Sequence, residues 1–151
     1  NLTLTGASYT FPAGKDFVIL VNGDLNIQTE VHVPIGSSAL FTASGNINVA
    51  SSVGEAVTSS TRANVEGYYS ADKSFYVQGI SSCPTADRRL NVAGSIAVNA
   101  ALTGGSFINQ RDLCTGNLQC PASTVTERPD FVLNSPDFLK SARRIWQEIA
   151  P

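Results

Sequence analysis

The sequence predicts an all-β fold, a right-handed parallel β-helix (solenoid) of about five coils closed by one C-terminal capping α-helix. Three observations lead to this prediction: a repeated strand motif, its regular spacing, and one amphipathic segment at the end of the chain. We divide the 151 residues into a β-solenoid over residues 1–134 and an amphipathic capping helix over residues 135–151. A chain of this length is one domain, and we expect both parts to belong to it.

The repeated motif is a glycine between alternating apolar residues. It is clearest in Val21–Ile27 and recurs in Ala43–Val49, Val65–Ala71 and Val92–Val98. In each copy, an apolar residue lies two positions before the glycine, and further apolar or aromatic residues lie two and four positions after it. Such alternation turns one face of a strand inward.

The spacing of the motif indicates stacked repeats. Its glycines are Gly23, Gly45, Gly67 and Gly94, so the first two intervals are equal and the last is slightly longer. A weaker copy at Leu2–Gly6 precedes them. A fixed period of about 20–50 residues is typical of solenoids. The alternative is a meander of antiparallel strands in a β-sandwich, but the regular spacing favours the solenoid.

The last segment has the pattern of an amphipathic helix. Ser135 suits the N-cap, Pro136 the first helical position and Asp137 the first turn. One face is apolar, formed by Phe138, Leu139, Ala142, Ile145, Trp146 and Ile149. We expect this helix to cover the open end of the solenoid; the alternative is a docking helix for a partner. Before it, Glu127–Asp130 is expected to be extended.

Composition excludes some partners. The formal net charge is −2 and 15% of residues are charged, so no basic surface for nucleic acid is expected. No run of 18 apolar residues is present, so we expect no membrane insertion. The small, uncharged polar composition is typical of extracellular β-structure. We expect a secreted or cell-surface protein, whose signal peptide would have been removed or would lie upstream.

The three cysteines suggest one disulfide. Cys114 and Cys120 bracket a short loop and are predicted to be bonded to each other in an oxidising compartment. Cys83 would then be unpaired, or would replace one of them. Three scattered cysteines and a distant His32 do not supply a zinc site. We therefore expect neither a metal nor a cofactor, and His32 is interpreted as a solvated residue.

No catalytic constellation is evident, and we expect the protein not to be an enzyme. A carbohydrate-cleaving site needs two carboxylates brought together. The positions after the four glycines hold Asp24, Asn46, Tyr68 and Ser95, and those before hold Asn22, Ser44, Glu66 and Ala93, so neither column stacks acids. The amides of Asn22, Asn26, Asn46 and Asn48 are expected to form hydrogen bonds along the stack instead.

Two carbohydrate functions remain as alternatives. Parallel β-helices include polysaccharide lyases and hydrolases, and a site built from loops would not be visible in the repeat. A carbohydrate-binding module would instead stack sugars on exposed aromatic side chains. The candidates for this role are Tyr68, Tyr69, Phe75 and Tyr76.

The repeats resemble the strands of bactofilin-like and other bacterial β-solenoid proteins. The closing part resembles the C-terminal module of large exported bacterial surface proteins, through Arg111–Leu113, Arg128–Asp130 and the Trp-x-Glu-x-Ala-Pro end at Trp146–Pro151. The resemblance implies a structural or adhesive module of a cell surface, or a subunit of an extracellular filament. The expected partners are neighbouring subunits or upstream domains at the N-terminal end of the solenoid, and surface carbohydrate.

Overall fold

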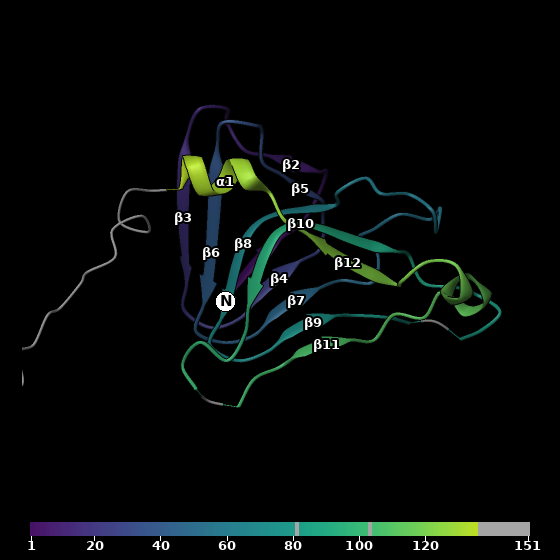
Figure 1. Cartoon of the computed structure of the whole chain (residues 1–151). Coiled ribbons are helices and arrows are strands. Elements are labelled where there is room, and N and C mark those ends of the chain that lie inside the picture. Colours follow the sequence, from purple (N-terminus) through teal and green to yellow (C-terminus); the bar gives the residue numbers. More distant parts are fainter. Residues whose placement is uncertain (81, 103, 136–151) are drawn as a thin grey trace, which may run out of the picture.

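The computed structural model describes residues 1–80, 82–102 and 104–135, and these form two parallel β-sheets (Figure 1). The five-stranded sheet has the order β1-β4-β7-β9-β11, and the seven-stranded sheet contains the path β12-β10-β8-β5-β2, with β3 paired to β6 and β6 to β8. The strands are β1 (Leu2–Leu4), β2 (Tyr9–Thr10), β3 (Asp16–Val21), β4 (Leu25–Ile27), β5 (Val31–His32), β6 (Ser38–Ala43), β7 (Ile47–Val49), β8 (Val65–Ala71), β9 (Phe75–Val77), β10 (Leu90–Ala97), β11 (Phe107–Asn109) and β12 (Ser123–Thr126). A 3₁₀-helix η1 (Cys114–Leu118) and an α-helix α1 (Pro129–Asn134) complete the described elements.

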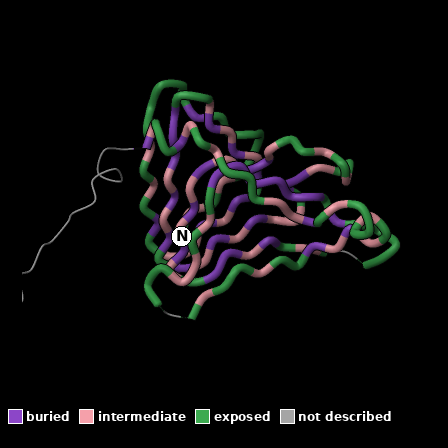
Figure 2. The backbone as a smooth tube through the Cα atoms, in the orientation of Figure 1, coloured by how far each residue is buried: buried purple, intermediate pink, exposed green. Residues whose placement is uncertain are grey.

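Alternation within the strands places the core between the two sheets. In β8, Val65, Gly67, Tyr69 and Ala71 are buried while the residues between them are half-buried. Strands β4, β7 and β9 repeat this pattern over three residues each. Figure 2 shows the buried positions recurring along neighbouring strands. The predicted inward faces of the repeats are therefore confirmed.

Aromatic rings form a continuous part of this core. The rings of Phe41 and Tyr69, which are in register on β6 and β8, stack with centroids 5.1 Å apart. Phe75 meets Tyr69 edge-on and stacks on Phe107 at 5.8 Å. Burial raises the pKa of the Tyr69 hydroxyl well above its ordinary value. These contacts link successive strands of both sheets through their inner faces.

The predicted right-handed β-solenoid of about five coils with a capping helix is wrong. The described residues form two parallel sheets of five and seven strands, without closing into a solenoid. One column of stacked positions contains Leu2, Leu25, Ile47, Phe75 and Phe107, and its last two sequence intervals are clearly longer than its first two. The repeat therefore lengthens along the chain, because loops of unequal length leave the sheets between strands.

The glycine spacing is misleading because the four glycines belong to two columns. Gly45 donates its N–H to the carbonyl of Gly23 at 2.9 Å, so these two stack at a corner. Gly67 lies inside β8, and Gly94 pairs with it in β10. Residues 50–64 are inserted before β8. Because of this insertion, Gly67 follows Gly45 by the same number of residues as Gly45 follows Gly23. Gly67 nevertheless lies in a different column.

The second glycine column requires glycine for steric reasons. Gly67 and Gly94 have φ angles of 141° and 140°, a region that side chains rarely adopt. A Cβ on Gly94 would lie 1.9 Å from the carbonyl oxygen of Gly67. The backbones of β8 and β10 can therefore approach closely here only because Gly94 carries no side chain.

A short helix precedes the segment that the sequence predicts to be helical. Segment 129–134, expected to be extended at its start, forms α1, with Pro129 in its first turn and Asp130 beside it. Ser135 is the C-cap residue of α1, and its hydroxyl donates to the carbonyl of Phe131. The predicted capping residues Phe138, Ala142, Ile145, Trp146 and Ile149 lie outside the described residues.

Among the described residues, no helix is long and apolar enough to cross a membrane.

Candidate functional site

Polar side chains at one corner of the sheets bind the backbone of the next strand. Asn1 Oδ1 accepts the N–H of Asp24 at 2.8 Å, and Asp24 Oδ1 accepts the N–H of Asn46 at 2.7 Å. Asn46 Oδ1 then accepts the N–H of Ser74 at 3.1 Å, and Ser74 Oγ accepts that of Ser106 at 3.1 Å. We call these five residues the corner ladder. Its side chains satisfy backbone donors that the corner would otherwise leave without partners.

The predicted amide contacts along the stack are confirmed. The Asn48 amide donates to Asn26 Oδ1 at 3.0 Å, and the Ser44 hydroxyl lies 3.4 Å from Asn22 Oδ1. The residues that follow the four glycines were expected to stack in one column, and this prediction is only partly correct. Asp24 stacks on Asn46, whereas Tyr68 stacks on Ser95 in the other glycine column.

The four candidate sugar-binding aromatics do not form one exposed surface. Tyr69 and Phe75 have 1% and 0% of their surface exposed and lie in the core, so neither can stack on a sugar. Tyr68 and Tyr76 are half-buried, but they lie on β8 and β9, which belong to different sheets. The predicted aromatic platform is therefore wrong for the two buried residues and is divided between two sheets for the others.

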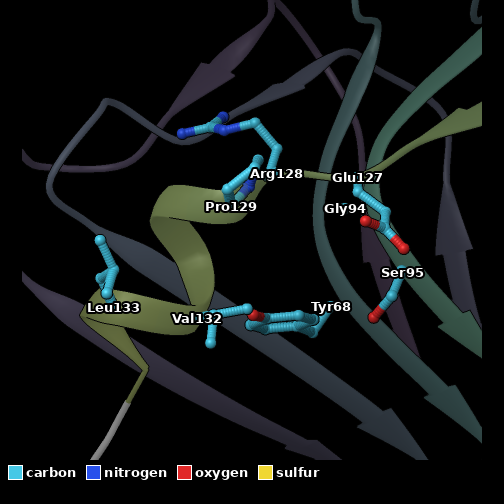
Figure 3. Close-up of a pocket in the computed structure, with 8 residues that line it drawn as sticks. All are labelled: Tyr68, Gly94, Ser95, Glu127, Arg128, Pro129, Val132 and Leu133. Carbon is cyan, nitrogen blue, oxygen red and sulfur yellow. The ribbon is translucent and has the colours of Figure 1, made fainter.

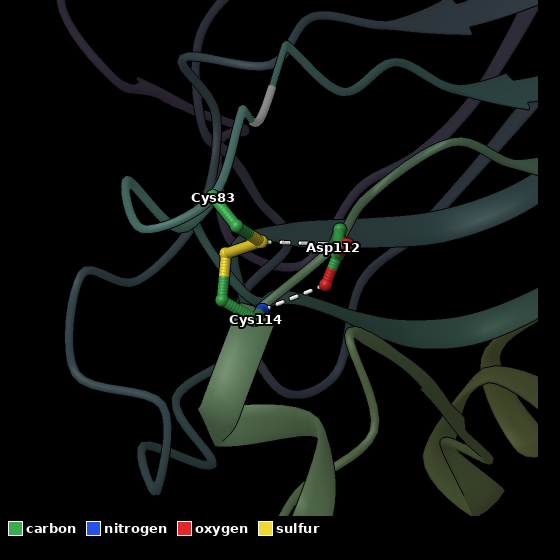
Figure 4. A group of neighbouring side chains, drawn as sticks. All are labelled: Cys83, Asp112 and Cys114. Carbon is green, nitrogen blue, oxygen red and sulfur yellow. Dashed lines mark hydrogen bonds between the residues drawn. A yellow bond between two sulfur atoms is a disulfide. The ribbon is translucent and has the colours of Figure 1, made fainter.

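The predicted Cys114–Cys120 disulfide is wrong, because Cys114 is bonded to Cys83 (Figure 4). Its two sulfurs belong to segments 31 residues apart, and Cys120 is a free, half-buried cysteine. The fold brings the 79–89 loop against η1, which sequence spacing alone does not reveal. A disulfide is compatible with an oxidising, extracellular compartment.

Asp112 lies beside this disulfide. Its Oδ1 accepts the N–H of Cys114 at 2.7 Å, and its Oδ2 lies 3.7 Å from the sulfur of Cys83 (Figure 4). Two cysteines and a carboxylate this close are ligand types that could hold a metal ion. Metal binding requires thiolates, however, and the bond between the two sulfurs removes both. This cluster therefore has a structural role in the oxidised protein.

Arg111, in a motif singled out from the sequence, joins three segments. Its guanidinium donates to the carbonyls of Gln78, Arg88 and Ala50 at 3.1, 2.9 and 2.8 Å. Only 6% of the residue is exposed, and burial lowers the pKa of Arg111 to about 10. All three hydrogen bonds go to backbone carbonyls, so the side chain stabilises the fold rather than contacting a ligand.

Arg128, in the second such motif, anchors α1 to the sheet. It forms a bidentate pair with Asp130, lies 3.3 Å from Glu66 and donates to the carbonyl of Val33. Its guanidinium also lies 4.2 Å from the ring centroid of Phe131. The hydrogen bonds from Arg128 hold the pKa of Asp130 below its ordinary value.

A second ionic cluster, around Arg62, was not visible in the sequence. Arg62 pairs with Glu30 and Glu55, and its hydrogen bonds lower the pKa of Glu30. His32, predicted to be solvated, is half-buried with its Nε2 3.3 Å from Glu30. Arg62 and Glu30 are 32 residues apart, so only the stacking of strands brings them together.

A groove of about 510 Å³ lies between α1 and the outer face of β8 and β10 (Figure 3). Tyr68 forms its floor beneath Val132, with Ser95 and Glu127 on the β10 side (Figure 3). Val132 and Leu133 are 67% and 77% exposed, so its walls are largely apolar. It holds one carboxylate, Glu127, whereas cleavage of a sugar chain uses two.

The two ends of the sheets also expose apolar side chains. At the N-terminal end, β1, β2 and β3 are edge strands. At the C-terminal end, β11 and β12 are edge strands, and β12 pairs only with residues 90–93 of β10. No described strand lies on that side of Gly94–Ala97. A cavity of about 300 Å³ opens beside it, lined by Ile96, Val98, Phe107 and Val125.

Comparison with protein-family models, curated proteins and solved structures found no match to this chain.

Proposed function

We propose that this chain is a non-catalytic structural or adhesive module of a bacterial cell surface, or a subunit of an extracellular filament. The observation that carries the proposal is the use of its polar side chains. The corner ladder, Arg111 and Arg128 bind backbone groups or other side chains of neighbouring strands. Side chains used in this way build a rigid stack and leave few groups arranged around a substrate.

Two further observations support an extracellular location. The Cys83–Cys114 disulfide suits an oxidising compartment. The Arg111–Leu113 and Arg128–Asp130 motifs resemble those of large exported bacterial surface proteins. Antibody labelling of intact and permeabilised cells tests this part: equal labelling supports surface exposure, and labelling only after permeabilisation contradicts it.

The absence of catalysis is tested with a panel of polysaccharides. We expect the purified chain to release neither reducing ends nor unsaturated products. Turnover that disappears in Glu127→Gln would contradict the proposal and would favour a carbohydrate-active enzyme with its site in the groove. Glu127 is chosen because it is the carboxylate that lines this groove.

A further inference from the structure

The geometry points to head-to-tail assembly, in which the N-terminal end of one copy of this chain adds its strands to the C-terminal end of another. This inference rests on the proposed structural function and supplies the partner and the contact surface. We call strands β1, β2 and β3 the N-terminal edge. We call strands β11 and β12 with residues 94–97 of β10 the C-terminal edge.

Two of the three strand columns continue directly from one copy to the next. In the stack, β1 lies in the column that ends at β11, and β2 lies in the column that ends at β12. Strands β2 and β3 lie in one layer, because β5 and β6, which pair with them, both pair with β8. A second copy placed head-to-tail would therefore add its β1 to β11 and its β2 to β12 as parallel strands, and its β3 would lie one layer beyond the side of Gly94–Ala97 that β12 does not pair.

The observed register predicts which residues meet. Leu2 of the second copy would follow Phe107, because Leu2, Leu25, Ile47, Phe75 and Phe107 already share one column. By the same rule, Tyr9 would follow Val125 and Thr10 would follow Thr126. The corner ladder would continue as well, since Ser106 would be followed by the next Asn1.

The chemistry of both edges suits this contact. Tyr9 and Val18 are 48% and 40% exposed on the N-terminal edge, and Phe107 and Val125 are 42% and 48% exposed on the C-terminal edge. Proteins usually block exposed edge strands with charged residues or proline. Here Asp16, at the start of β3, is the single charged residue in the strands of the two edges, so no like charges oppose their pairing.

The size of the contact and its symmetry also suit a second copy. The first turn of the chain, residues 1–24, matches the roughly 20–30 residues that each partner contributes to a stable interface. The contact joins two different surfaces, so it does not close on itself and would generate open chains of molecules. A symmetric contact between two identical edges would instead place the strands antiparallel and end at a dimer.

Mixing two blocked variants tests the inference by sedimentation velocity. Tyr9→Lys blocks the N-terminal edge and Val125→Lys blocks the C-terminal edge, while Ile80→Lys, at a residue 81% exposed and outside both edges, is the matched control. The wild type and the control should sediment faster as concentration rises. Each blocked variant alone should stay monomeric, and an equimolar mixture should form a one-to-one dimer and nothing larger.

Several results would overturn the inference. Dimers of either blocked variant alone would indicate a symmetric contact, and a wild type that stays monomeric at every concentration would exclude self-assembly. Folding of each variant is checked by circular dichroism, and Thr10→Lys with Thr126→Lys provides a second blocked pair. A monomeric wild type would leave the surface-module proposal standing, whereas sugar turnover would refute that proposal and leave assembly untouched.

Discussion

At the residue scale, single polar side chains hold neighbouring strands in register. Asp24 illustrates this, because its carboxylate accepts the backbone N–H of Asn46 at 2.7 Å. The sequence identified the stacked amides correctly, since they recur at the same place in the first two clear repeats. It could not identify the partners of Glu30 or Glu66, because these contacts join segments that are distant in the sequence. For Cys83 it left a bond to Cys114 or Cys120 open as an alternative, and the bond to Cys114 is the one observed.

Substitution of Asp24 tests the corner ladder. Asp24→Ala leaves a backbone donor without its partner, and we expect a loss of about 1–3 kcal/mol in the free energy of unfolding. Asp24→Asn keeps an acceptor oxygen and should lose clearly less. Urea unfolding measures both. Equal losses in the two variants would show that charge, rather than the hydrogen bond to Asn46, is what matters here.

The pair of Asp130 and Arg128 predicts a dependence on pH. The pKa of Asp130 is lowered in the folded protein, so the unfolded state binds its proton first as the pH falls. The stabilisation is complete above the unfolded value of about 3.9 and is lost as the pH falls through the lower folded value. Asp130→Asn should therefore flatten the urea midpoint against pH below about pH 4; an unchanged curve would contradict this.

At the scale of elements, short segments are fixed by a few buried anchors. Helix α1 has only six residues and would not be stable alone, but Phe131 is fully buried against Tyr68. The sequence carried the signal for this helix, because Pro129 and Asp130 repeat the pattern recognised in Pro136 and Asp137. The strands themselves were largely predictable, whereas their columns were not. The inserted residues 50–64 give Gly45 and Gly67 the spacing of neighbouring repeats, although the two glycines lie in different columns.

Truncation of the buried anchor should detach α1. Phe131→Ala is expected to lower the free energy of unfolding by about 3–5 kcal/mol, the usual range for a buried phenylalanine. The neighbouring Val132, which is 67% exposed, provides the control, and Val132→Ala should change stability by less than about 0.5 kcal/mol. Similar losses in both variants would mean that α1 does not pack on the sheet through Phe131.

The disulfide joins two loops and should stabilise the fold by lowering the conformational entropy of the unfolded chain. For a separation of 31 residues, Cys83→Ser should cost about 3–4 kcal/mol in the chain-entropy view. Cys120→Ser, which removes the free cysteine, should change stability little. Non-reducing peptide mapping gives an independent check. A peptide linking Cys114 to Cys120 would contradict the observed pairing.

At the scale of the whole molecule, the two parallel sheets form a stack with different exposed ends. Alternation in the sequence predicted parallel strands with one inner face, and that part of the prediction is confirmed. The closed solenoid was wrong, because the described strands form two parallel sheets of five and seven strands without closing. The ends were only partly predictable: that β1, β2 and β3 form one end followed from the order of the repeats. That β12 pairs with only the first half of β10 depends on the chain leaving the sheet after Thr126.

The central claim is that this molecule acts through the two ends of its stack. Hydrogen–deuterium exchange of the wild-type chain, compared between dilute and concentrated solutions, tests this claim most directly. We predict slower exchange at high concentration in β1 and β2 and in β11 and β12, with α1 and the groove beside Tyr68 unchanged. Slower exchange confined to α1 and the groove, or no change in any strand, would contradict it.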